Sequence, residues 1–137
     1  MIGTRATKYD KIKGQLEPGD NITIISCNTC VRLATTGGEE KMKELALKLR
    51  GEGFNVIDGF LITYPCDDSY YENIRLSPNV NTIIMLSCSS GYANAQYHYP
   101  DVKIIQAVEN RGVVINEIVI EDDGTERKKK NIRRVKV

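Results

Sequence analysis

Short, nearly continuous apolar runs recur along the chain and predict the strands of a buried sheet. Residues 21–26 form the first run, and residues 81–87 form a second of the same kind. Runs without polar alternation are typical of parallel strands that are covered on both faces. Residues 54–64 are also strand-like, but an Asp-Gly pair at 58–59 interrupts them and suggests a bulge or a later start. Residues 102–108 predict one more strand.

The clearest helix lies between the predicted strands at 21–26 and 54–64. Its apolar stripe has the i, i+3, i+4, i+7 spacing of an amphipathic helix and consists of Met42, Leu45, Ala46 and Leu49. Thr36 or a neighbour is expected to cap its start, and a glycine just past the stripe is expected to end it. Shorter helices are predicted at 9–16, 67–76 and 89–99.

Strands and helices that alternate in this way favour right-handed βαβ crossovers and therefore a parallel sheet. We predict an α/β fold, a Rossmann-like or flavodoxin-like open parallel sheet flanked by helices, with a C-terminal β-hairpin. The hairpin is expected from strand-like residues 113–121, an Asp-Asp-Gly turn at 122–124 and the strongly basic arm that follows. We expect a single domain over 1–137, with its core at 1–112 and the basic hairpin extension at 113–137.

The composition limits the possible partners without identifying one. The 137 residues carry a formal net charge of +1, so the protein as a whole exerts no strong attraction on nucleic acid or on a membrane surface. A membrane span is suggested by a run of about 18 apolar residues, and no apolar run of this chain approaches that length. Residues 1–20 are polar and charged and lack an apolar signal segment, which predicts a cytoplasmic location. Structural disulfides are then not expected.

The four cysteines are the residues that most strongly suggest chemistry. Cys27, Cys66 and Cys88 each follow an apolar strand, and Cys30 completes a Cys-x2-Cys step with Cys27. Because parallel strands share one carboxyl edge, where ligands of open α/β sheets bind, the four sulfurs are expected at one rim. Four thiolates are the donor set of zinc sites and of iron–sulfur clusters. The sequence therefore predicts one metal centre with all four cysteines as ligands, either a four-iron four-sulfur (4Fe–4S) cluster or one zinc ion.

Two simpler interpretations of the cysteines stay open. Each could be a small buried apolar residue, as free cysteines commonly are. Cys27 and Cys30 could instead form a redox pair, although residues 31–37 separate them from the helix whose dipole would lower a thiol pKa. A redox pair would also leave the other two cysteines without a role. His98, the single histidine of the chain, is a minor candidate ligand because four sulfurs already suffice.

Two further motifs suggest other ligands. Thr35, Thr36, Gly37 and Gly38 resemble the phosphate loop of flavodoxins, whose hydroxyls and backbone amides hold FMN. FMN is not favoured, because this loop begins late after its strand and Glu39 places negative charge where a phosphate would lie. The basic C-terminal arm could contact RNA, but it lacks aromatic residues for base stacking. An edge strand guarded by lysines is the simpler interpretation, so nucleic acid is not expected as a partner.

The first cysteine motif and the helix after it resemble the cysteine-rich accessory domain of methylenetetrahydrofolate reductases, which also occurs as the MetV-type small subunit. The matching residues are Ile24-Ile25-Ser26-Cys27-Asn28-Thr29-Cys30-Val31 and Gly37-Gly38-Glu39. Cys66 fits the family's lone cysteine after the second strand, and Cys88 fits its third-strand cysteine. The resemblance covers about residues 9–112, and the chain has no later cysteine to match the family's second cysteine-rich segment.

The resemblance implies a Rossmann-like domain whose four-cysteine metal centre supplies electrons or structure to a flavin-containing reductase subunit. We therefore expect an accessory or electron-transfer protein with one metal centre, and a methylenetetrahydrofolate reductase-like partner in one-carbon metabolism. A structural zinc domain for protein association is the main alternative, and a flavodoxin-like FMN or nucleotide binder is the third. No nucleophile is paired with a base, so independent catalysis is not expected. The oligomeric state and the strand order stay open.

Overall fold

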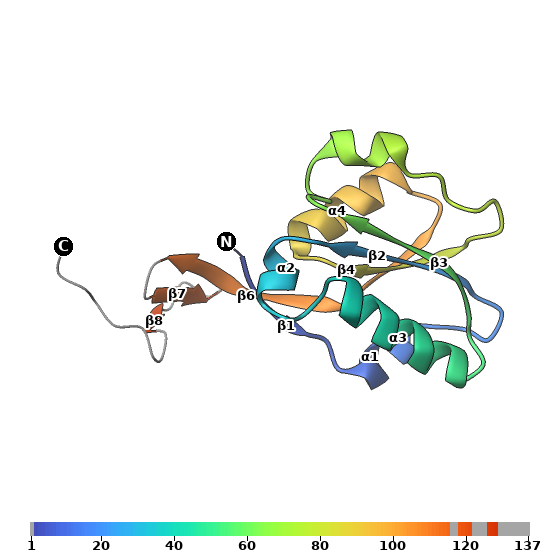
Figure 1. Ribbon diagram of the computed structural model, residues 1–137, viewed down its shortest axis with the longest axis horizontal. Helices are drawn as coiled ribbons and strands as arrows, with labels where there is room; N and C mark the ends of the chain where they lie inside the picture. The colour runs from blue at the N-terminus through green and yellow to red at the C-terminus, as the bar shows by residue number, and fades with distance from the viewer. Residues whose placement is uncertain (1, 116–117, 122–125, 129–137) are drawn as a thin grey trace.

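The strands of the described residues form two sheets (Figure 1). The computed structural model describes residues 2–115, 118–121 and 126–128, with side chains described as far as Val113. The first sheet has four parallel strands in the order β3-β2-β4-β5, which are β2 (Asn21–Cys27), β3 (Asn55–Ile62), β4 (Thr82–Leu86) and β5 (Lys103–Gln106). The prediction of an α/β fold with a parallel sheet flanked by helices is therefore confirmed.

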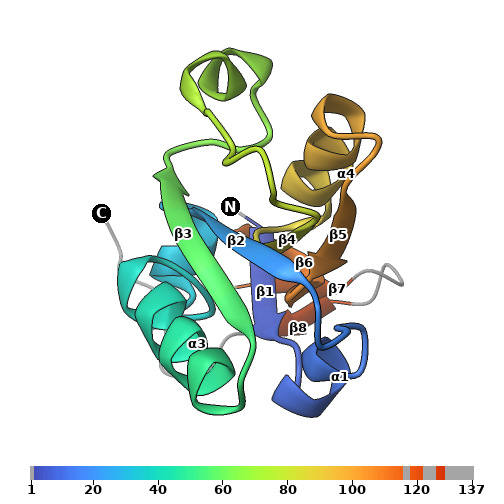
Figure 2. The ribbon, with the colours of Figure 1, turned by 90° about the vertical axis from the view of Figure 1, so that its right-hand side faces the viewer.

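Helical segments cover both faces of the parallel sheet (Figure 2). They are α1 (Tyr9–Lys13), α2 (Cys30–Leu33), α3 (Glu39–Gly51), the 3-10 helix η1 (Asp68–Asn73) and α4 (Ser89–His98). Neighbouring residues of β2 belong to different buried clusters, because successive side chains of a strand point to opposite faces. Ile24 lies in the cluster of Leu49 from α3, whereas Ile25 lies in the cluster of Ala95 from α4. Among the described residues, no helix has the length and hydropathy that a membrane-spanning segment needs.

The second sheet is antiparallel, and its first strand was not predicted from the sequence. Its order is β1-β6-β7-β8, with β1 (Ile2–Ala6), β6 (Val108–Ile115), β7 (Ile118–Glu121) and β8 (Glu126–Lys128). β7 and β8 pair as a hairpin does, but the expected strand at 113–121 is divided between β6 and β7, which pair with each other. Figure 1 shows these strands extending away from the parallel sheet. The rest of the predicted basic arm, 129–137, lies outside the described residues.

Local hydrogen bonds explain where helices and strands depart from the predicted pattern. The segment predicted as a helix at 67–76 is the shorter η1, and Asp67 caps it, since its Oδ1 accepts from the Ser69 amide at 3.0 Å. The bulge suggested at the Asp-Gly pair lies one residue earlier. Val56 and Asp58 of β3 pair with successive residues of β2, so Ile57 is the extra residue.

The prediction that Thr36 caps the amphipathic helix is wrong. α3 begins at Glu39, and the residue before it is Gly38, whose φ of 91° suits a glycine. The Thr36 hydroxyl lies 2.6 Å from the Thr4 hydroxyl instead. Because Thr4 belongs to the unpredicted strand β1, this partner was not visible in the local sequence.

Asp20, a buried carboxylate directly before β2, predicts a pH-dependent contribution to stability. Asp20 accepts a hydrogen bond from Lys103 Nζ at 2.6 Å and from the Glu17 amide at 2.8 Å. Burial alone would raise the pKa of Asp20, but these hydrogen bonds and the Lys103 charge lower it below its ordinary value. A carboxyl whose pKa is lowered by folding stabilises the protein above its unfolded pKa of about 3.9, and the stabilisation is lost as the pH falls.

We therefore expect Asp20→Asn to lower the free energy of unfolding by about 1–3 kcal/mol at pH 7, as expected for hydrogen bonds to a charged group. The difference from the wild type should shrink as the pH approaches 3. Urea unfolding at several pH values measures it, with the exposed Asp101→Asn as the matched control. A loss of equal size at pH 7 and pH 3 would show that the Asp20 charge is not responsible.

Candidate metal centre

Three of the cysteines lie at the carboxyl edge of the parallel sheet, as predicted. Cys27 is the last residue of β2, Cys66 follows the end of β3, and Cys88 directly precedes α4. The chain passes from β2 to β3 on one side and then to β4 on the other side. In open α/β sheets, ligands bind outside the carboxyl ends of the strands where the order reverses in this way. Here that position lies between β2 and β4, so Cys27 and Cys88 flank it.

The turn between Cys27 and Cys30 is hydrogen-bonded to the loop after β3. Cys27 is buried, its Sγ accepts from the Thr29 amide at 3.3 Å, and the same thiol lies 3.6 Å from the Thr63 carbonyl oxygen. The Thr29 hydroxyl donates to that carbonyl oxygen at 2.7 Å. Cys30, which is half-buried, is the first residue of α2. Thr63 therefore connects the first cysteine pair to the segment that carries Cys66.

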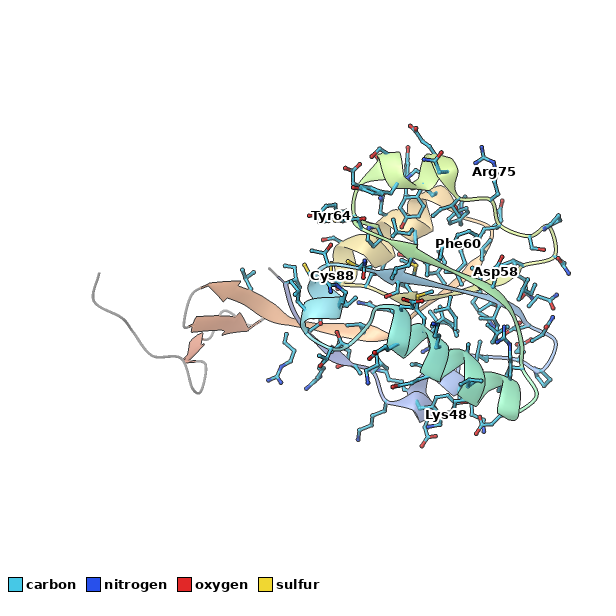
Figure 3. The ribbon with its side chains drawn as sticks, in the orientation of Figure 1. Lys48, Asp58, Phe60, Tyr64, Arg75 and Cys88 are labelled. Carbon is cyan, nitrogen blue, oxygen red and sulfur yellow. The ribbon has the colours of Figure 1, made fainter. Side chains whose placement is uncertain are left out.

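The other side of that segment packs against α4. The Pro65 carbonyl oxygen accepts from Asn94 Nδ2 at 3.0 Å. A Cβ added at Gly91 would lie 3.1 Å from Pro65 Cγ, so a glycine permits this close approach. Cys66 is exposed and Cys88 is half-buried, and Figure 3 shows Tyr64 and Cys88 on the same side of the parallel sheet, the side from which β6 extends. The loop that carries Cys66 thus lies between the Cys27–Cys30 turn and the start of α4.

The other three cysteines affect the pKa of the Cys66 thiol. Loss of water contacts raises the pKa of the Cys66 thiol, although the residue is exposed, and the neighbouring groups of Cys88, Cys27 and Cys30 raise it further. Thiolates that repel one another favour the protonated state, unless a cation lies between them. The same set of residues would therefore be stabilised in its deprotonated form by a bound metal.

The four cysteines are the right type of ligand for a thiolate metal centre, but their side chains are too far apart to coordinate one ion. Four thiols suit zinc or an iron–sulfur cluster. Within the described residues, however, no three side chains of His, Cys, Asp or Glu are grouped closely enough to hold a metal ion. The sequence brings the cysteines to one edge of the sheet, and coordination would require a further approach of the sulfurs.

No protein-family model, curated protein or solved structure matches the chain. The resemblance to the accessory domain of methylenetetrahydrofolate reductases therefore stays a prediction.

The loop considered for FMN already uses its polar groups within the protein. The Gly38 amide donates to Ser26 Oγ at 2.8 Å, and the amides of Thr36 and Gly37 donate to the Val31 carbonyl at 2.8 and 3.1 Å. A hollow of about 480 Å³ adjoins Thr35, Gly37 and Gly38, and its charged lining residues are Arg32, Glu39, Glu40 and Lys41. A phosphate held by the loop amides would have to displace the hydrogen bonds that these amides already make, so the geometry does not favour FMN.

Sequence reasoning missed the partners of His98. Its Nε2 lies 3.0 Å from Asp68 Oδ1, and its ring stacks on Tyr71 with centroids 4.4 Å apart. The Tyr71 hydroxyl is buried without a hydrogen-bond partner among the described residues. His98 and Cys88 lie at opposite ends of α4, about 15 Å apart for ten residues of helix. His98 therefore packs against η1 rather than beside Cys88, and no spacing in the sequence signals this contact.

Proposed function

We propose that the protein binds one metal centre through Cys27, Cys30, Cys66 and Cys88. It would serve as an accessory or electron-transfer subunit of a flavin-containing reductase, related to the small subunit of methylenetetrahydrofolate reductases. One observation carries the proposal: the loop of Cys66 is hydrogen-bonded to the Cys27–Cys30 turn through Thr63 and to α4 through Pro65. These bonds hold the loop of Cys66 against the Cys27–Cys30 turn on one side and against α4, which Cys88 precedes, on the other.

A flavodoxin-like or Rossmann-like fold is part of the same proposal. The observed order β3-β2-β4-β5 corresponds to 2-1-3-4 when the parallel strands are numbered along the chain. Flavodoxin-like folds begin with this order and continue with a fifth parallel strand. In this chain the fifth place is absent from the described parallel sheet, and β6 instead joins the antiparallel one.

Each cysteine would contribute in a way that its surroundings favour. Cys88 precedes a ten-residue helix, whose positive end stabilises a thiolate. The Arg32 Nε donates to the Asn28 carbonyl at 3.1 Å and holds the turn between Cys27 and Cys30. Cys66 is the exposed member on a loop, so it would make the approach that coordination requires. A bound cluster would supply one-electron transfer, whereas zinc would supply only a cross-link between loops.

Metal loading under anaerobic conditions tests the proposal. The protein is incubated with zinc, or with iron and sulfide, and its metal content, visible spectrum and free thiols are then measured. We expect one zinc ion or one cluster per chain and the loss of four titratable thiols; brown absorbance that bleaches on reduction identifies a cluster. Stoichiometric zinc without any cluster would support the structural zinc domain instead. Chain alkylated at its thiols is the control, and four free thiols after both treatments would refute the metal centre.

A further inference from the structure

A second cavity lies beside α3, along the face of that helix that carries Lys41, Glu44, Leu45 and Lys48. It has a volume of about 220 Å³ and opens between α3, the connection from β1 to α1, and the ends of β4 and β5. A cavity of about 150 Å³ holds one benzene molecule, so this one accommodates a compact organic ring with a small substituent. Nothing in the proposed metal centre uses it.

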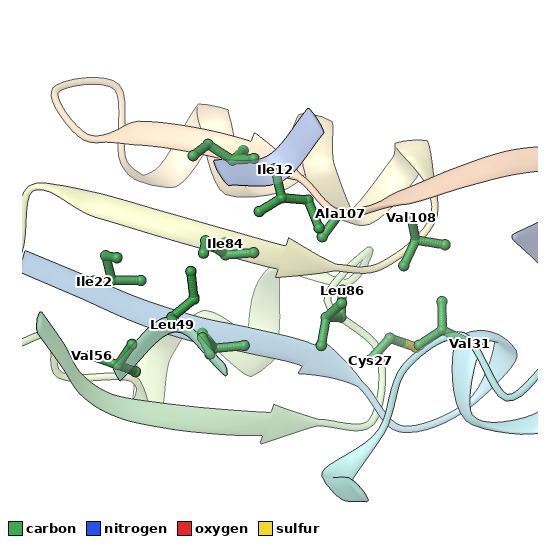
Figure 4. Packing of buried hydrophobic residues seen from close by; sticks show 12 residues of the cluster. Ile12, Ile22, Cys27, Val31, Leu49, Val56, Ile84, Leu86, Ala107 and Val108 are labelled. Carbon is green, nitrogen blue, oxygen red and sulfur yellow. The ribbon is translucent and has the colours of Figure 1, made fainter. Parts of the chain in front are cut away.

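The wall of this cavity is mainly apolar. Ile12, Leu86 and Ala107 are buried and belong to one core cluster, and Leu45 of α3 packs against that cluster. Figure 4 shows Ile12 and Ala107 together, with Leu86 nearby. Leu45 remains half-buried, although it is part of the apolar stripe of its helix. An apolar ligand body in the cavity would complete its burial.

One polar group in the wall has no partner. The Thr7 side-chain hydroxyl is buried and makes no hydrogen bond to any described residue, and Thr7 as a whole is only 8% exposed. Its amide donates to the Ala107 carbonyl at 3.0 Å, which holds the backbone against the cavity wall. Buried hydroxyls without partners are rare, because they lose their bonds to water.

The charged residues of the cavity belong to its exposed side. Lys41, Glu44 and Lys48 lie on one face of α3, and Glu44 and Lys48 are exposed. The Lys48 ammonium lies 4.0 Å from the centroid of the Tyr9 ring, and Lys41 Nζ lies 3.4 Å from Glu44 Oε2. Two ammonium groups and one carboxylate leave a net positive charge at this opening. The opening therefore favours an anionic group on the ligand.

We propose that this cavity binds a small organic acid with a compact hydrocarbon body and a second polar group. The hydrocarbon body would contact Leu45, Leu86 and Ala107, and the carboxylate would lie near Lys48 at the opening. The second polar group would form a hydrogen bond with the Thr7 hydroxyl. This proposal is independent of the metal centre, since none of its residues is a candidate metal ligand.

Amide chemical shifts in the metal-free protein test the proposal, with benzoate and 3- and 4-hydroxybenzoate as probes. We expect saturable shifts of the Thr7, Leu45 and Ala107 amides, and tighter binding of at least one hydroxybenzoate than of benzoate. Thr7→Val keeps the shape of the side chain and removes its hydroxyl. It should abolish that preference, a loss of about fivefold for one neutral hydrogen bond. Retention of the preference in this variant would refute the contact with Thr7.

Two pairs of variants on α3 locate the binding site. Leu45→Phe fills the cavity and should abolish the shifts, whereas Leu47→Phe, at a position that is 70% exposed, should leave them unchanged. Lys48→Met should weaken binding about threefold, as expected for one exposed charge pair, and Lys43→Met should not. Thermal unfolding shows that each variant is folded. The absence of saturable shifts in the wild type, or equal binding by the two phenylalanine variants, would overturn the proposal.

Discussion

Replacing Cys66 by serine is expected to weaken zinc binding by about 100-fold without changing the metal-free fold. A structural zinc site binds with about 10–16 kcal/mol, so one thiolate of four accounts for about 3 kcal/mol. Cys66 is exposed, so its replacement by serine does not disturb the core. The free energy of unfolding without metal should therefore change by less than about 0.5 kcal/mol. Competition with a chromophoric zinc chelator measures the affinity, and urea unfolding measures the stability.

Two further variants distinguish loss of a ligand from loss of structure. Ser90→Ala changes an exposed residue close to Cys88 and should bind zinc as the wild type does. Cys27→Ser should lose both affinity and stability, because Cys27 is only 7% exposed and its sulfur belongs to the apolar core cluster. If Cys66→Ser binds zinc as tightly as the wild type, Cys66 is not a ligand and the four-cysteine centre is wrong.

The position of the cysteines at the carboxyl edge of the sheet could be predicted because the central strands are visible in the sequence as apolar runs. Ile24 and Ile25 are both fully buried, one in each core cluster, so β2 places apolar side chains on both faces of the sheet. The same is true of Ile83 and Ile84 in β4. Strands of this kind are parallel and covered by helices, which is why the carboxyl edge followed from the residues alone.

The strand β1 could not be predicted, because the strand that it pairs with is distant in the sequence. Ile2–Ala6 is only half-buried or exposed and contains a glycine and an arginine, so it lacks the signature of a strand. It pairs with β6, more than a hundred residues later in the chain. The Thr4–Thr36 contact depends on that pairing, so the partner that Thr36 has in place of a helix cap could not be predicted either.

The separation of the sulfurs could not be predicted for a different reason. The strands fix which edge the cysteines occupy, whereas the loops around Thr29 and Pro65 fix how closely the thiols approach. Those loops are held by a few local hydrogen bonds, several of them between a side chain and the backbone, which no periodic pattern encodes. The sequence therefore specifies the donor set and the edge of the sheet, and the loop conformation decides whether they converge.

The second large effect is expected in the core beneath α3, where Leu49→Ala should lower the free energy of unfolding by about 2–5 kcal/mol. Leu49 is fully buried and belongs to the cluster that contains Ile24 and Val56. Its truncation removes the transfer free energy of the side chain and leaves a cavity between α3 and the sheet. A domain is stable by only about 5–15 kcal/mol, so the loss should be a large fraction of the total. Urea unfolding followed by circular dichroism measures it.

Leu47→Ala provides a matched control on the same helix. Leu47 is 70% exposed, so its truncation removes almost no buried surface, and the two substitutions change helix propensity in the same way. We expect Leu47→Ala to change the free energy of unfolding by less than about 0.5 kcal/mol. The difference between the variants therefore isolates burial from propensity. If both variants lose the same free energy, α3 is not held on the sheet by Leu49, and the cavity proposed for an organic acid loses the wall that α3 provides.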